Sequence, residues 1–161
     1  VYSIVGFELD HTLSESGSVS RGICAYDKEQ HLTDIVEHLN IAREADGKVY
    51  GDNSLSGETH VELVADNLCS MNMWGFTPDY FEKSEKIFES FLEQNINELK
   101  KEFYIPYAID CMIKSGEAQT DVLSTPSHWF GVTYKEDRPA VVAKFQEFAD
   151  KGVYPSPLYT K

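Results

Sequence analysis

The sequence predicts an α/β protein with a mixed sheet. Short apolar segments typical of strands are interleaved with helical segments whose apolar residues recur at the 3.6-residue period. Two of the strand segments, 22–26 and 32–37, are joined by a short polar loop, which is typical of a β-hairpin. Because strands and helices intermix with a hairpin, we expect a sheet that contains both parallel and antiparallel pairs.

The individual elements follow from the same patterns. Strands are expected over 1–9, 22–26, 32–37, 70–76, 118–123 and 129–133, and helices over 78–94, 107–115 and 136–148. Thr77 is expected to cap the first helix, and Pro78 occupies the first helical position, where no amide donor is needed. Gly116 suits a left-handed cap after the second helix.

One segment shows little periodicity. Residues 40–61 are rich in Gly, Ser, Asp and Asn, so we expect a long surface loop or flap there. Because it follows Glu37 and His38, this flap could close over a bound ligand. The remaining elements are expected to form, with it, a single domain over 1–161.

Composition narrows the class of partner. The 161 residues are 42% hydrophobic and 12% aromatic, as in ordinary globular proteins, and the net charge of −13 opposes binding to nucleic acid or anionic lipid.

No apolar run approaches the ~20 residues of a membrane span, and no signal peptide is recognisable. A cytoplasmic location is therefore expected. Cys24, Cys69 and Cys111 lack metal or redox spacing and are expected to be buried thiols.

Asn72 is the one amide within an otherwise apolar strand segment, Ser70 to Phe76. An amide side chain both donates and accepts hydrogen bonds, so Asn72 could read the hydroxyl groups of a polyhydroxylated ligand. It could instead only satisfy neighbouring backbone groups, as buried polar side chains usually do. Both interpretations stay open at this point.

Three segments together resemble a known family. In order and spacing, residues 21–38, 71–76 and 129–133 resemble the C-terminal, sugar-binding half of the sugar-phosphate nucleotidyltransferases. The resemblance covers nearly the whole chain. It implies the C-terminal portion of a nucleotide-diphospho-sugar transferase (GT-A-like) fold, in an enzyme that forms an NDP-sugar and pyrophosphate from an NTP and a sugar 1-phosphate.

The resemblance also implies roles for particular residues. Gly22 would let the sugar approach the backbone, while Glu37 and Asn72 would bind sugar hydroxyls. His38 stands where the family usually has a lysine that contacts the sugar phosphate. Since the reference pKa of histidine is about 6.5, His38 would replace that charge only in part. Lys135 is the other candidate phosphate contact, although a solvated lysine would look the same.

A magnesium site is implied after the last expected strand. There the family commonly places an Asp or Asn that holds Mg²⁺, and the nearest candidates in this chain are Thr133 and Asp137. A neutral hydroxyl is a weaker Mg²⁺ ligand than a carboxylate. Mg²⁺ is thus expected in the full-length enzyme.

The glycine-rich nucleotide loop of the family has no counterpart in this chain. We therefore expect a fragment that holds the acceptor side without the triphosphate side and is inactive alone. The alternatives are a non-catalytic sugar-phosphate binding module, or a protein-interaction domain anchored by the aromatic pairs Trp74/Phe76 and Trp129/Phe130. The expected partners of the full-length protein are sugar 1-phosphate and NTP. The sequence does not decide whether the protein forms an oligomer.

Overall fold

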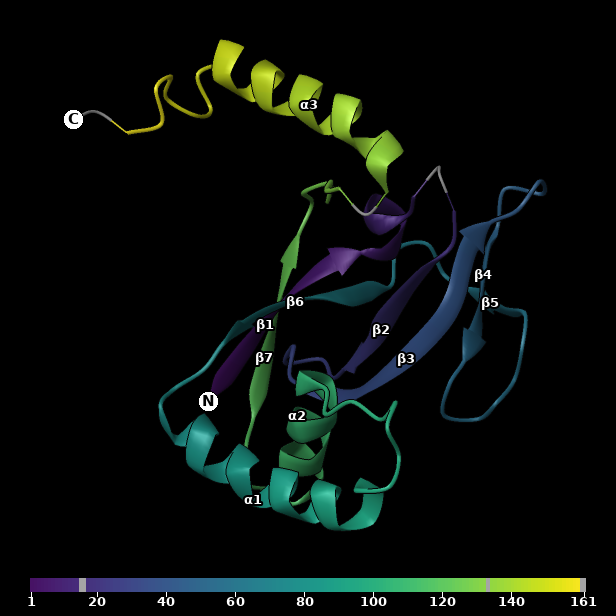
Figure 1. Ribbon diagram of the computed structural model, residues 1–161, viewed down its shortest axis with the longest axis vertical. Coiled ribbons are helices and arrows are strands. Elements are labelled where there is room, and N and C mark those ends of the chain that lie inside the picture. Colours follow the sequence, from purple (N-terminus) through teal and green to yellow (C-terminus); the bar gives the residue numbers. More distant parts are fainter. Residues whose placement is uncertain (15–16, 133, 160–161) are drawn as a thin grey trace.

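The computed structural model describes residues 1–14, 17–132 and 134–159. These residues form an α/β fold with a seven-stranded mixed sheet and three α-helices, which confirms the predicted class (Figure 1). The strands are β1 (Tyr2–Glu8), β2 (Val19–Tyr26), β3 (Leu32–Arg43), β4 (Val49–Asn53), β5 (Val61–Leu63), β6 (Leu68–Gly75) and β7 (Thr120–Thr125). The helices are α1 (Asp79–Asn95), α2 (Ile105–Lys114) and α3 (Arg138–Asp150), with short 3-10 turns η1 (Leu9–Thr12) and η2 (Lys135–Asp137).

The strand order is β5-β4-β3-β2-β6-β1-β7. Strands β1 and β7 are parallel, and the other neighbouring pairs are antiparallel. Because β1 and β7 run the same way, their carboxyl ends meet at one edge of the sheet, where η1 and the segment 126–132 continue the chain. Ligands of open α/β sheets commonly bind at such an edge.

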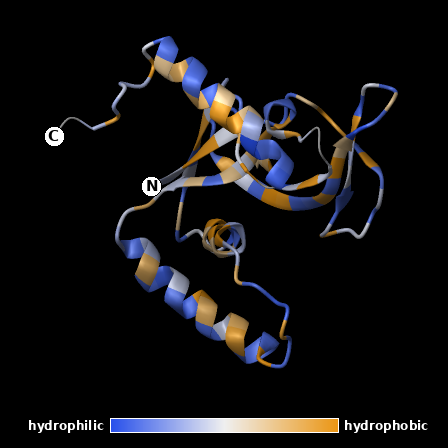
Figure 2. Cartoon of the chain, turned by 45° about the horizontal axis from the view of Figure 1, so that its top comes forward, coloured by the Kyte–Doolittle hydropathy of each residue, from blue (hydrophilic) through white to orange (hydrophobic). Residues whose placement is uncertain are grey.

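Helices α1 and α2 cover one face of the sheet. The core on this face contains buried side chains from α2, such as Ala108, Ile109 and Met112, packed with strand residues such as Ile4 and Val122. In Figure 2, α2 lies between the sheet and α1. Its apolar side therefore holds the helical layer against the strands.

A second apolar cluster lies on the opposite face. Leu9 of η1 packs with Ile41, Val49, Leu63 and Cys69, all of which are less than a tenth exposed. Strands β4 and β5 lie beside β3 at one end of the sheet (Figure 1) and contribute Val49 and Leu63 to this cluster. The sheet is therefore buried on both sides by different parts of the chain.

The tip of the β2–β3 hairpin reaches across to β7. The backbone N–H of Val122 donates to the carbonyl of Gln30 at 2.8 Å, and His31 forms an isolated bridge with Asp121. The His31 ring also lies between two carboxylates, 3.4 Å from Asp27 and 3.6 Å from Asp121. The hairpin is thus tied to the far edge of the sheet.

Two sequence expectations were wrong. The predicted surface loop over 40–61 contains the end of β3, which runs to Arg43, and the whole of β4. The strand expected over 129–133 is absent from residues 129–132, and residue 133 lies outside the described residues. In the first case a bulge at Asn40, with φ of 52°, hides the alternation; in the second, Trp129 bonds to η1 instead of to a neighbouring strand.

The predicted helices are present with small shifts of their ends. Thr77 does not cap α1, because its hydroxyl donates to the carboxylate of Asp79 instead of accepting a backbone N–H. Helix α3 lies away from the sheet (Figure 1), and its aromatic residues Phe145 and Phe148 pack with Phe130 and Tyr154. None of the described helices combines the length and apolar character needed to cross a membrane.

Candidate functional site

Strand register brings two of the predicted sugar-binding residues together. Gly22 of β2 is the direct partner of Glu37 on β3 and of Ser70 on β6. Ser70 in turn pairs with Gly6 of β1, which pairs with Ser124 of β7. A row of mostly small residues thus crosses five strands on the helix-bearing face, with Glu37 at one end.

The absence of a side chain at Gly22 is required by packing. A methyl group on Gly22 would lie 3.0 Å from Cγ1 of Ile35 and 3.4 Å from Oε2 of Glu37. Ile35 therefore occupies the space that the resemblance assigns to a sugar, and a ligand would contact Glu37 before it reached the Gly22 backbone. The glycine lets Ile35 and Glu37 lie close to β2.

The Glu37 carboxylate is uncommitted. Within the described residues it has no hydrogen-bond or ion-pair partner, while the backbone carbonyl of Glu37 accepts two bonds from Ser54, at 2.7 and 3.0 Å. More than a third of the residue is exposed, yet desolvation of the carboxyl group raises the pKa of Glu37, and Arg21 partly offsets this rise. A carboxylate in this position can accept hydrogen bonds from a ligand.

His38 lies on the other face. Side chains alternate along a strand, so His38 points away from the face that carries Glu37. Its side chain is 6% exposed, and Nδ1 lies 3.0 Å from the carbonyl oxygen of Val36. The two predicted ligand contacts are therefore not brought together, and the cross-strand neighbour of His38 is Arg21.

Asn72 occupies a bulge in β6. Between the pairs Gly6–Ser70 and Ile4–Trp74, β6 has two more residues than β1, and Asn72 has φ of 55°. Its backbone N–H donates to Oγ of Ser70 at 3.2 Å, and the residue is exposed. Asn adopts this left-handed conformation more readily than other residues with a side chain. The conformation accounts for the residue type, and the exposed amide stays accessible to a ligand.

This conformation gives the first testable prediction. Asn72→Ala should lower the free energy of unfolding by about 1 kcal/mol relative to Asn72→Gly, because only glycine takes positive φ without a steric penalty. Urea denaturation of the two variants measures the difference. Equal stabilities, or a more stable alanine variant, would show that the bulge does not require positive φ.

Lys135 and Asp137 lie at the start of α3. Tyr134, which precedes them, is 3.6 Å from the position of a methyl group on Gly17, so η2 sits beside the loop that follows η1. The carboxylate of Asp137 accepts the backbone N–H of Tyr134 at 2.8 Å, and Lys135 is exposed. No hydrogen bond or ion pair between described residues joins Lys135 to Glu37 or Asn72.

The described residues do not bring together a set of ligands for the predicted Mg²⁺ ion. Thr133 lies outside the described residues, and Asp137 uses a carboxylate oxygen at the helix start. In the described part of the chain, no group of three or more His, Cys, Asp or Glu side chains is placed to hold an ion. Mg²⁺ in the full-length protein therefore stays a prediction.

Two open hollows lie elsewhere. One, of about 360 Å³, is lined by Tyr2, Asp79, Lys83 and the turn 116–119; the other, of about 570 Å³, lies between the loop after η1 and the end of β3. Neither is lined by Glu37, Gly22 or Asn72.

Sequence reasoning missed a group of residues at the carboxyl ends of β1 and β7. Arg21 is the first residue of the segment 21–38, where the sequence assigned it no role. It donates from Nε to Oγ1 of Thr12 at 3.1 Å and lies over the Trp129 ring at 5.5 Å. The rings of His11 and His128 are 3.8 Å apart between centroids. A parallel pairing of strand 1–9 with strand 118–123 would have signalled this meeting point.

Comparison with known proteins adds no identification. A scan against protein-family models and a search of curated proteins both found no match to this chain.

Proposed function

We propose that this chain is the sugar 1-phosphate-binding portion of a nucleotidyltransferase with a GT-A-like fold. The observation that carries the proposal is the uncommitted carboxylate of Glu37 beside Gly22 on the helix-bearing face. The mixed α/β sheet is compatible with that fold. The proposed family and reaction rest on the resemblance of residues 21–38, 71–76 and 129–133 to the nucleotidyltransferases.

In the full-length protein, an oxygen of the sugar phosphate attacks the α-phosphorus of an NTP, and pyrophosphate leaves. Glu37 accepts hydrogen bonds from sugar hydroxyls, and the exposed amide of Asn72 reads another hydroxyl. Orientation of two reactants can contribute about 7–11 kcal/mol to lowering the barrier. Lys135 is the candidate phosphate contact that is exposed, whereas His38 is buried on the other face.

Glu37→Gln in the full-length enzyme tests the proposal. Replacing the charged acceptor should raise KM for the sugar 1-phosphate about tenfold or more, because a hydrogen bond to a charged group contributes about 1.5–3 kcal/mol. KM for the NTP should change less than twofold. Steady-state pyrophosphate release, with each substrate varied in turn, measures both constants.

Glu62→Gln is a matched control, because Glu62 is an exposed strand carboxylate that pairs with Lys48 at 2.7 Å. It should leave both constants unchanged. Loss of NTP binding in Glu37→Gln with sugar-phosphate affinity intact would reverse the assignment. The isolated chain should release no pyrophosphate, since it lacks the nucleotide loop, and turnover by pure protein would contradict that expectation.

A non-catalytic sugar-phosphate binding module is the second candidate. The burial of His38 and the use of Asp137 in a helix start favour it, because both remove groups that turnover would need. Binding of sugar 1-phosphate without pyrophosphate release by the full-length protein would identify this case.

The third alternative, a protein-interaction domain, is less well supported. Trp74 and Phe76 pack against the core under α1 and α2, and Phe130 packs against α3. Trp129 is 36% exposed and lies under Arg21. The aromatic pairs are therefore mostly engaged within the chain.

A further inference from the structure

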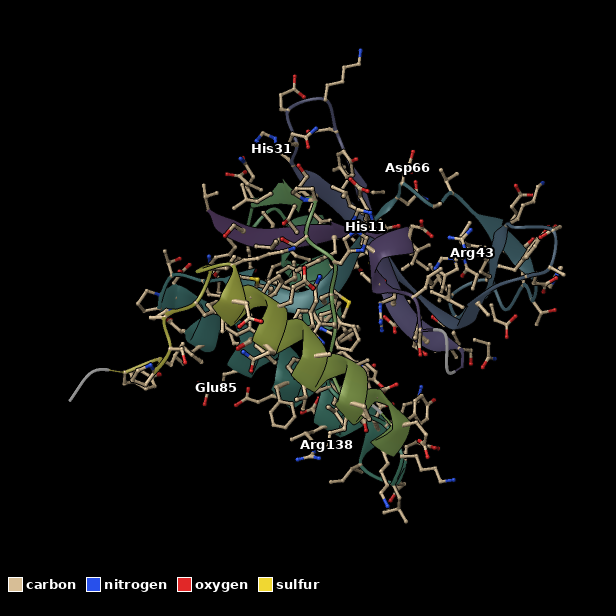
Figure 3. All side chains as sticks on the ribbon, turned by 90° about the horizontal axis from the view of Figure 1, so that it is seen from above. His11, His31, Arg43, Asp66, Glu85 and Arg138 are labelled. Carbon is tan, nitrogen blue, oxygen red and sulfur yellow. The ribbon has the colours of Figure 1, made fainter. Side chains whose placement is uncertain are left out.

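The residues missed by sequence reasoning form a compact group, which we call the Arg21 cluster: Arg21, Thr12, His11, His128 and Trp129. Parallel strands β1 and β7 place η1 and the segment 126–132 side by side. The backbone N–H of Trp129 donates to the carbonyl of His11 at 3.0 Å, which joins the two segments. In the view of Figure 3, His11 lies between His31 and Arg43.

Arg21 is a half-buried cation that has no carboxylate within ion-pair distance among the described residues. Its guanidinium donates to Oγ1 of Thr12 at 3.1 Å, to the Thr12 carbonyl at 2.6 Å and to the Ser20 carbonyl at 2.8 Å. All three acceptors are uncharged, and within the described residues no carboxylate forms an ion pair with Arg21. One N–H on each terminal nitrogen is left without an acceptor there. By contrast, Arg43 is paired with Asp10.

The lack of an ion pair for Arg21 within the described part of the chain is unusual in so acidic a protein. The protein has 27 acidic and 14 basic residues, so carboxylates are abundant. Burial lowers the pKa of Arg21, and the nearby Cys69 and Glu37 offset part of this effect, although arginine stays protonated. A bound anion would offset the desolvation of the guanidinium.

Two histidines add donors next to Arg21. Nδ1 of His11 is shielded from solvent and has no hydrogen-bond partner among the described residues, and the nearest carboxylate, Oε2 of Glu8, is 3.5 Å away. His128 is exposed and its ring lies against that of His11. Each histidine ring donates through at least one of its nitrogens, so both rings can offer an N–H to an anion.

We propose that the Arg21 cluster binds a phosphate group, either as inorganic phosphate or as the end of a phosphomonoester. Arg21 supplies the two remaining N–H groups, whose planar arrangement matches phosphate oxygens, and the two histidines supply further donors. Trp129 holds the guanidinium from one side. Because strand alternation places Arg21 on the face opposite Glu37, this site does not depend on the proposed function.

Phosphate titration followed by ¹H–¹⁵N NMR tests the proposal on the chain as it exists. Potassium phosphate is added against potassium chloride at constant ionic strength, and the Trp129 indole and Arg21 Nε–H signals are followed. Both should shift saturably, with a Kd of about 1 mM or tighter. Equal shifts in chloride, or no saturation by about 20 mM phosphate, would overturn the proposal.

Variants separate the site from general charge effects. Arg21→Gln should weaken phosphate binding at least tenfold, and Arg43→Gln, which removes a paired arginine, should change it less than twofold. His128→Gln affects an exposed side chain, so it should fold normally and weaken binding several-fold. If Arg21→Gln does not fold, His128→Gln decides, and binding as tight as that of the unmodified chain contradicts the site.

A second titration, with glucose 1-phosphate, distinguishes a phosphomonoester ligand from free phosphate. Glucose 1-phosphate that shifts the Trp129 and Arg21 signals at lower concentration than inorganic phosphate identifies a phosphomonoester as the ligand. The reverse order identifies the free ion. In either case Glu37→Gln should not weaken inorganic phosphate binding, because it removes a negative charge that interacts with Arg21, so a failure of the acceptor assignment is recognised separately from a failure of this one.

Discussion

Ile109→Ala is expected to lower the free energy of unfolding by about 2–5 kcal/mol. Ile109 is fully buried on α2, and its side chain lies in the core between this helix and the sheet. Removal of its outer carbons would leave a cavity that the rigid strands beneath α2 can fill only in part. Urea denaturation gives the change directly, and each kcal/mol should lower Tm by about 2–4 °C.

Ile105→Ala is the matched control. It makes the same change on the same helix, at a side chain that is 37% exposed, and should cost less than Ile109→Ala by about 1.5 kcal/mol or more. Similar losses for the two variants would mean that α2 is not held to the sheet by the face that carries Ile109.

Local patterns were enough to predict the elements whose residues contact their own neighbours in sequence. The β2–β3 hairpin and helices α1 and α2 follow from turn residues and from the 3.6-residue period. Strand β4 could not be recognised, because its centre, Gly51, is a residue typical of turns. In the fold, Gly51 is buried, and a methyl group there would lie 2.9 Å from Ile41. A glycine is needed at this position because of close packing in the core, and the sequence alone does not show which residues pack there.

In the candidate site, too, some features follow from local patterns and others depend on the whole fold. That Glu37 and His38 face opposite sides of the sheet follows from strand alternation alone, and it could have been predicted once the strand was assigned. The pairing of Gly22 with both Glu37 and Ser70 depends on strand order, which a single sequence does not specify. The bulge at Asn72 depends on register in the same way.

The Arg21 cluster is the part of the structure that the sequence predicted least well. Its members lie at sequence positions from 11 to 129, and they meet because β7 lies parallel to β1 at the end of the sheet. Parallel neighbours are separated by long connections, so their pairing is a property of the whole fold. Charge counting alone would have paired Arg21 with one of the many carboxylates.

The second large effect concerns Cys24 in alkaline solution. Burial raises the pKa of the Cys24 thiol from 9.0 to about 12, with a smaller contribution from Cys69. Below pH 9 the thiol is neutral in both the folded and the unfolded chain. Between about pH 9 and 12 it ionises only when the chain unfolds, so unfolding releases a proton and stability falls as pH rises.

The expected slope is about 1.4 kcal/mol of lost stability per pH unit from this one group. Tyr2 and Tyr80, whose pKa values are also raised by burial, change stability in the same direction. They are retained in Cys24→Ala, so the difference between the unmodified chain and this variant isolates the thiol. Urea denaturation at pH 8, 9, 10 and 11 measures that difference.

Cys24→Ala should be the less stable protein at pH 8, because it loses a buried side chain, and its disadvantage should shrink as pH rises. Cys111→Ala, at a half-buried position on α2, serves as the control for removal of a thiol. Parallel stability curves for the unmodified chain and Cys24→Ala over this pH range would mean that the Cys24 thiol reaches solvent. In that case the layer formed by α2, Leu32 and Ile35 around it would be more open than the structure shows.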